Sequence, residues 1–215
     1  MENNKCSQKT GRRLNAAGRV VILAAVLLTL QVNWVFAEGN NVTVDALPKT
    51  VESYISLRDS LARTPEGGAS LFLVAMMVMK ENPEVGLQMM TVMLDRSLVT
   101  SGKTYLGYAP VSSVMFHIDR ITREKGWSYL PAAYVAGTSP ADGYRCTPPY
   151  TYQISRNAYS GEESGGTVKV FVKTYGVMPR PVTMKVNDKG IWKVAELSSL
   201  FVDVAPPASD KTDDL

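Results

Sequence analysis

The stretch 64-TPEGGASLFLVAMMVM-79 decides the fold of this chain. It opens with Thr64 and Pro65, a capping residue followed by a proline in the first helical turn, which predicts the start of a helix. Residues 71–79 are nine consecutive apolar residues. This run is too short to span a bilayer and is apolar on every side, so we expect the buried central helix of a globular domain.

Helical patterns lie on both sides of this central helix. Upstream, apolar residues at helical spacing from Val51 predict a first helix that ends at about Arg63. Downstream, Asn82 and Pro83 repeat the signal of a cap followed by proline, and they open a third helix through Leu98. A fourth helix is expected over about 111–125, so the domain begins with about four helices.

The second half of the chain alternates apolar and polar residues in the pattern of β-strands. The alternating segments are residues 150–155, 168–173, 182–186 and 191–194, with a turn at 187–190 before the last. Helices followed by a strand meander predict an α+β fold, in which about four N-terminal helices pack on one face of a C-terminal antiparallel sheet of about four strands. Lysines between the apolar positions mark the solvated face of that sheet.

The N-terminus has the pattern of a signal peptide: a basic segment, an apolar run over 20–30 and small or medium residues at 35–37. Cleavage is predicted after Ala37, with export to the periplasm or the extracellular space. The run is shorter than the roughly 20 apolar residues of a spanning helix, so no stable membrane span is expected after cleavage. The expected organisation is a signal peptide (1–37), a flexible lead-in segment (38–47), a single α+β domain (48–204) and a disordered tail (205–215).

Removal of the leader changes the charge of the chain. The leader holds five basic residues and one acidic residue, so the 23 basic and 20 acidic residues of the whole chain fall to 18 and 19. A net charge of −1 gives no electrostatic attraction to nucleic acid, which we therefore do not expect as a partner. Only Cys146 survives cleavage, which excludes an intramolecular disulfide and favours a half-buried loop thiol.

Several patterns resemble chemical motifs but lack their spacing. Ser101–Thr104 reads SGKT, yet Ser97 stands where a phosphate-binding loop needs glycine, so an ordinary loop is expected. The single histidine, His117, excludes a His-rich metal site and has no sequence neighbour placed to make it a general base. Methionine thioethers are suitable ligands for Cu(I). Here the methionines lie in apolar helices, so we expect them to pack in the core; they are Met76, Met77, Met79, Met89, Met90 and Met93. No catalytic residue, cofactor or metal ligand is assigned.

The segment 127–150 joins the helical half to the strands and is rich in prolines and aromatic residues. Tyrosine and tryptophan offer a broad contact area at low entropic cost and recur in recognition surfaces. We therefore predict a candidate interaction surface for an unknown protein, peptide or small ligand, formed by Trp127, Tyr129, Tyr134, Tyr144 and Tyr150. The alternative is that these aromatics fill the junction between helices and sheet.

Turn prolines, glycines and aromatics carry a resemblance to a known family. They are found in 129-YLP-131, 143-GY-144, 149-PY-150 and 180-RPV-182, and at Gly190 and Trp192. With these residues the chain resembles an exported bacterial family of unknown function over about 61–206. The resemblance implies a single domain and bacterial export, and it implies no activity, ligand or catalytic residue.

The sequence thus favours an exported, non-catalytic binding or interaction domain that uses segment 127–150. Two alternatives stay open. One is a hydrolase whose active-site residues are scattered in the sequence, and the other is a structural protein of the cell envelope.

Overall fold

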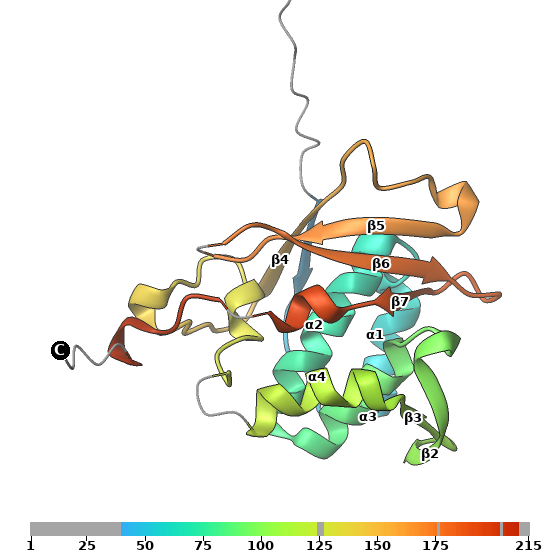
Figure 1. Cartoon of the computed structure of the whole chain (residues 1–215), viewed down its shortest axis with the longest axis horizontal. Coiled ribbons are helices and arrows are strands. Elements are labelled where there is room, and N and C mark those ends of the chain that lie inside the picture. The colour runs from blue at the N-terminus through green and yellow to red at the C-terminus, as the bar shows by residue number, and fades with distance from the viewer. Residues whose placement is uncertain (1–39, 124–126, 176, 203, 211–215) are drawn as a thin grey trace, which may run out of the picture. The chain divides into compact units, whose positions relative to one another are not determined.

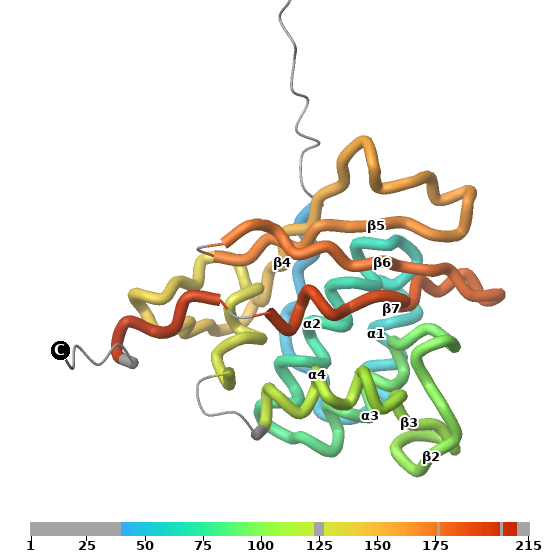
Figure 2. Tube along the Cα trace, viewed as in Figure 1, coloured from blue at the N-terminus to red at the C-terminus, as the bar shows by residue number. Residues whose placement is uncertain are grey.

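The computed structural model describes residues 40–123, 127–175, 177–202 and 204–210. The predicted signal peptide lies outside the described residues, as does the last part of the predicted tail. Figure 1 shows helices α1 to α4 gathered on one side of a sheet that contains β4 to β7. Figure 2 shows the same path as a continuous trace, with the segment after α4 running beside the C-terminal segment.

Four helices form where the sequence predicts them: α1 (Val51–Leu61), α2 (Pro65–Glu81), α3 (Pro83–Met93) and α4 (Ser112–Arg123). Helices α2 and α3 begin at the predicted caps followed by proline. The Thr64 side chain accepts a hydrogen bond from the backbone N–H of Gly67, and that of Asn82 accepts one from Val85. These bonds satisfy N–H groups that have no partner within the first turn of a helix. Helix α3 ends at Met93, five residues before the predicted end.

Helix α2 is the core of the domain. It contacts the other three helices and all five strands of the main sheet, and fifteen of its 17 residues are buried. Its methionines and those of α3 are buried, which confirms that they pack in the core. The nine-residue apolar run therefore has protein on every side, as expected.

The main sheet is antiparallel in the order β1-β4-β5-β6-β7. Its strands are β1 (Asn40–Val44), β4 (Tyr150–Ser155), β5 (Thr167–Val172), β6 (Arg180–Val186) and β7 (Trp192–Glu196). Along β5, Val168, Val170 and Val172 are buried while Lys169 is exposed. The α+β prediction and the four predicted strands are confirmed.

Three parts of the fold differ from the sequence prediction. The disordered tail predicted over 205–215 is wrong at its start, where Ala205 accepts a hydrogen bond from the Tyr144 hydroxyl and Ala208–Asp210 form a 3-10 helix. Two segments predicted as flexible or as a loop are strands. The flexible segment predicted over 38–47 is wrong at β1, which pairs with β4 from Val44↔Tyr150 to Asn40↔Ile154. The loop predicted at Ser101–Thr104 is part of a hairpin, β2 (Val99–Tyr105) and β3 (Tyr108–Pro110). Both are polar edge segments, which pair through their backbone and show little apolar alternation.

The segment that leaves α3 covers the far side of β7. Leu94 forms a parallel bridge with Val194, and the N–H of Asp95 donates to the Val194 carbonyl oxygen at 2.8 Å. The outer edge of the last strand of a sheet otherwise presents backbone N–H and C=O groups without partners. This contact places the end of α3 against β7, where the candidate site lies.

Close approach of α2 to its neighbours depends on two glycines. A Cβ on Gly68 would lie 2.6 Å from the Trp192 carbonyl oxygen in β7. A Cβ on Gly86 would lie 2.3 Å from the Met79 Cα, where α3 crosses α2. Neither neighbour is a flexible side-chain end, so a methyl group would force the backbones apart.

We expect Gly86→Ala to lower the free energy of unfolding by about 2 kcal/mol, although alanine is the better helix former by up to about 1 kcal/mol. Urea denaturation of the variant and the wild type measures this difference. Gly165→Ala is the matched control, because a Cβ there meets nothing within 4 Å. Unchanged or increased stability of Gly86→Ala would contradict the close packing of α2 and α3.

A buried ion pair joins the first turn of α2 to the end of β4. Arg156 donates from Nη2 to Glu66 Oε2 at 2.8 Å and to Glu163 Oε1 at 2.7 Å. The Glu66 side chain is only 4% exposed, whereas that of Glu163 is 47% exposed. A buried partner is costly to remove, because its removal leaves a poorly solvated charge behind.

Glu66→Gln is therefore expected to lower the free energy of unfolding by about 2 kcal/mol, measured by urea denaturation at pH 7. Glu163→Gln removes a carboxylate from the same arginine at an exposed position and should cost less than about 0.5 kcal/mol. Equal losses for the two variants would show that burial does not set the strength of this interaction.

Candidate functional site

The predicted aromatic surface is buried. Tyr129, Tyr134, Tyr144 and Tyr150 are at most 9% exposed, and Trp127 is partly buried beneath the Arg120 guanidinium, 3.9 Å from the ring centre. These four tyrosines do not form an exposed recognition surface, and that part of the prediction is wrong. The structure has the alternative arrangement, in which the aromatics pack with the core.

Three of these tyrosines hold the C-terminal segment. The hydroxyl of Tyr134 donates to the Leu200 carbonyl oxygen at 2.7 Å, and that of Tyr144 donates to Ala205 at 2.6 Å. Tyr129 donates to the Val204 carbonyl oxygen at 3.2 Å, and its ring stacks on that of Tyr144. A buried hydroxyl needs such a partner, so these contacts assign the tyrosines a structural role.

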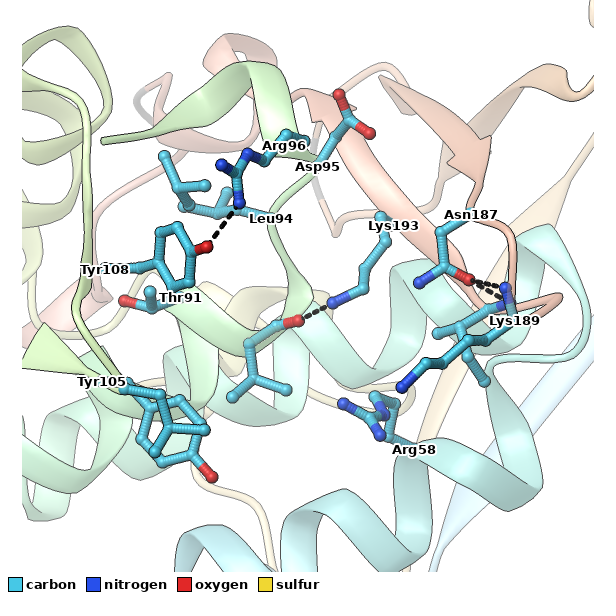
Figure 3. Close-up of a pocket in the computed structure, with 14 residues that line it drawn as sticks. Arg58, Thr91, Leu94, Asp95, Arg96, Tyr105, Tyr108, Asn187, Lys189 and Lys193 are labelled. Carbon is cyan, nitrogen blue, oxygen red and sulfur yellow. Dashed lines mark hydrogen bonds between the residues drawn. The ribbon is translucent and has the colours of Figure 1, made fainter. Parts of the chain in front are cut away.

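A pocket lies elsewhere, between the end of α3, the β2–β3 hairpin, the β6–β7 turn and α1 (Figure 3). We call it the Lys193 pocket. It encloses about 520 Å³, within the usual range of small-molecule sites. Its apolar lining is Val92, Leu94, Val99, Leu106 and Ile191, and its basic lining is Arg58, Arg96, Lys189 and Lys193.

The charged ends of three basic side chains point into one side of this pocket. Figure 3 shows Lys193 directed towards α3, with Lys189 and Arg58 beside it. They come from three separate places, since Arg58 is in α1, Lys189 in the β6–β7 turn and Lys193 in β7. Asp59 binds Arg58 at 2.7 Å, whereas neither lysine forms an ion pair within the part of the chain that the structure describes.

Lys193 is the least ordinary of these groups. It is partly buried, and its Nζ donates to the carbonyl oxygen of Val92 in the last turn of α3. Burial lowers the pKa of Lys193 to about 8, helped by the positive charge of Arg58 and opposed by Asp95 and Asp59. The last backbone carbonyl groups of a helix have no partner within the helix, and a positively charged side chain at this end binds them favourably.

The β2–β3 hairpin forms the opposite wall. Arg96 lies over the ring of Tyr108, 4.7 Å from its centre, and donates to the Tyr108 hydroxyl at 2.7 Å. At the hairpin tip, Leu106 is 79% exposed and has a φ of 46°, in the left-handed region. This conformation is costly for leucine, and it leaves a large apolar side chain at the mouth of the pocket.

His117 and Cys146, the single histidine and the cysteine expected to remain after cleavage, do not line this pocket. His117 lines a smaller hollow of about 240 Å³ with Glu196 and Ser198, where Ser198 donates to Glu196 and not to the imidazole. Its Nδ1 is buried and has no hydrogen-bond partner among the described residues. Burial raises the pKa of the half-buried Cys146 thiol, which disfavours the reactive thiolate.

Within residues 40–123, 127–175, 177–202 and 204–210, no three His, Cys, Asp or Glu side chains are grouped so that they could hold a metal ion. No helix in the same residues has the length and apolar character needed to cross a membrane.

Comparison with known proteins gives a family. A model described as "Domain of unknown function (DUF6935)" matches residues 46–208. Neither the comparison with curated proteins nor that with solved structures finds a match. The family description assigns no activity, so the chemistry of the pocket must be argued from its own residues.

The lowered pKa of Lys193 predicts how stability depends on pH. Between pH 8 and the ordinary value of 10.5, the unfolded chain binds more protons at this lysine than the folded chain does, so stability rises with pH. We expect the free energy of unfolding of the wild type, relative to Lys193→Met, to increase by about 2 kcal/mol from pH 7 to pH 10. Urea denaturation across this range measures it, and a constant difference would contradict the burial of this amine.

Proposed function

The chain belongs to the family described as a domain of unknown function (DUF6935), and we propose that it is a non-catalytic binding domain whose ligand is a small organic anion held in the Lys193 pocket. The single observation that carries the proposal is the convergence of Arg58, Lys189 and Lys193 on one side of that pocket. Cations held close together repel one another, and an anion between them relieves that repulsion.

The opposite side of the pocket indicates what the anion carries. Val99, Tyr105 and Leu106 offer apolar and aromatic surface across from the basic groups. A ligand that contacts both sides of the pocket therefore has one carboxylate, sulfonate or phosphate group and an apolar or aromatic body. Volume limits this body to the size of an ordinary metabolite rather than a folded partner.

The two other functions considered from the sequence receive less support. A hydrolase needs a nucleophile bound to a base, and in the described chain Ser198 binds Glu196 while His117 Nδ1 has no partner. A structural envelope protein would bury a large apolar patch against its neighbours. The most exposed large apolar side chains here come from four separate segments, at Leu106, Phe116, Tyr159 and Met178.

Export remains part of the proposal. Its support is the signal-peptide pattern of residues 1–37, which lie outside the described residues, and the resemblance to an exported bacterial family. The pocket would then meet its ligand in the periplasm or the extracellular space.

Binding of 8-anilinonaphthalene-1-sulfonate to the full chain at pH 7 tests the proposal, because this fluorescent probe joins a sulfonate to an aromatic body. We expect the double substitution Lys189→Gln with Lys193→Gln to weaken binding at least about tenfold, since it removes two of the three cations. The neutral probe N-phenyl-1-naphthylamine should bind both proteins alike. Circular dichroism establishes that the variant is folded.

Lys103→Gln with Lys169→Gln is the matched control. It removes the same total charge from two exposed positions that do not line the pocket. If both double variants bind the sulfonate probe equally weakly, the effect is due to net charge. If the Lys189→Gln, Lys193→Gln variant binds the probe as the wild type does, the Lys193 pocket is not the binding site.

A further inference from the structure

The amine of Lys193 is placed as a nucleophile rather than only as a cation. Its one hydrogen bond within the described chain goes to the Val92 carbonyl oxygen, an acceptor that binds the amine in its neutral form as well as its charged form. A neutral amine that donates one N–H to this carbonyl keeps its lone pair free for the open side of the pocket. No carboxylate of the described residues forms a hydrogen bond to Nζ and so fixes its positive charge.

Loss of solvent is the main reason why the amine is partly neutral. Burial lowers the pKa of Lys193 to about 8; the positive charge of Arg58 acts in the same direction, and Asp95 and Asp59 act against it. A useful fraction of Lys193 is therefore neutral at pH 7. Lys189 lines the same pocket, and Lys185 lies directly opposite Lys193 on β6.

We propose that Lys193 forms an imine with an anionic aldehyde, whose carboxylate or phosphate group is held by Lys189 and Arg58. The lone pair of Nζ attacks the carbonyl carbon, and a carbinolamine forms after proton transfer from nitrogen to oxygen. Loss of this oxygen as water leaves the C=N bond, so one amine and one aldehyde give one imine and one water, with no oxidant or reductant. This inference rests on the proposed function, because the anion site supplies the orientation.

Lys193 and its two basic neighbours fit the two ends of such a ligand. The aldehyde carbon must reach Nζ, whereas the anionic end needs the Lys189 ammonium and the Arg58 guanidinium, which Figure 3 places on the same side of the pocket. A ligand with a short chain between carbonyl and carboxylate can span the two. The need for an aldehyde group restricts the ligand class from any organic anion to anions that can bind covalently and reversibly.

Reductive trapping tests this step on the full chain. Succinic semialdehyde serves as the anionic aldehyde, and sodium cyanoborohydride reduces any imine to a stable secondary amine, which peptide mapping by mass spectrometry assigns to a residue. At pH 7 an amine of pKa near 8 is neutral about 300 times more often than one of ordinary pKa. We expect Lys193 to be modified at least about tenfold faster than the exposed lysines.

Three comparisons separate this inference from the proposed function. Butanal has nearly the same shape without the carboxylate and should modify Lys193 at least about tenfold more slowly. Lys193→Arg keeps a cation but has no nucleophilic amine, so it should lose the adduct at this position. Lys185→Arg removes the lysine opposite on β6 and should leave the Lys193 adduct unchanged.

Each outcome has a distinct meaning. Adducts spread evenly over the exposed lysines, or sulfonate binding without a Lys193 adduct, would overturn the imine and leave the anion pocket intact. Equal modification of Lys193 by butanal and succinic semialdehyde would overturn the anionic ligand class and the proposed function together, while it would retain a reactive lysine. An undiminished total adduct yield in Lys193→Arg would overturn the assignment of the reactive amine to Lys193.

Discussion

Burial of α2 on all sides is the constraint on which the rest of the structure depends. The helix packs against the five-stranded sheet and against α1, α3 and α4. The absence of side chains at Gly67, Gly68 and Gly86 lets α1, β7 and α3 approach it closely. Because α3 is drawn against α2, its last turn and the following Leu94–Asp95 segment reach β7. The position of the Lys193 pocket is therefore a consequence of how the core packs, and not of a separate loop.

Local signals made the helices and the central strands predictable. Thr64-Pro65 and Asn82-Pro83 mark helix starts because their effects act within one turn. The missed strand β1 depends on a distant partner, because it is a strand only where β4 lies beside it, more than a hundred residues later. The missed β2–β3 hairpin is local, but its polar residues show little apolar alternation. Distance along the chain also hides the role of Tyr129, Tyr134 and Tyr144, since the carbonyl groups that accept their hydroxyls belong to residues 200–205.

The pocket shows where alternation along a strand misleads. Lys193 stands between the buried Trp192 and Val194, so the pattern places it with the lysines of a solvated face, as it correctly does for Lys169. It differs from Lys169 because β7 is the last strand of the sheet and the end of α3 lies against it. No signal within residues 191–194 carries this information. The pairing of one helix end with one strand, 100 residues apart, decides which lysine is an ordinary solvated charge and which is a partly dehydrated amine.

The tyrosine hydroxyls that hold residues 200–205 have a consequence for the order of events during synthesis. Their acceptors lie 61 to 75 residues further along the chain than the tyrosines, and β7, which contacts α2, comes shortly before them. Until those residues have been made, the aromatic segment would bury hydroxyls without acceptors. Contacts between residues so far apart in sequence form slowly. The packing of segment 127–150 therefore has to wait until residues 200–205 have been made.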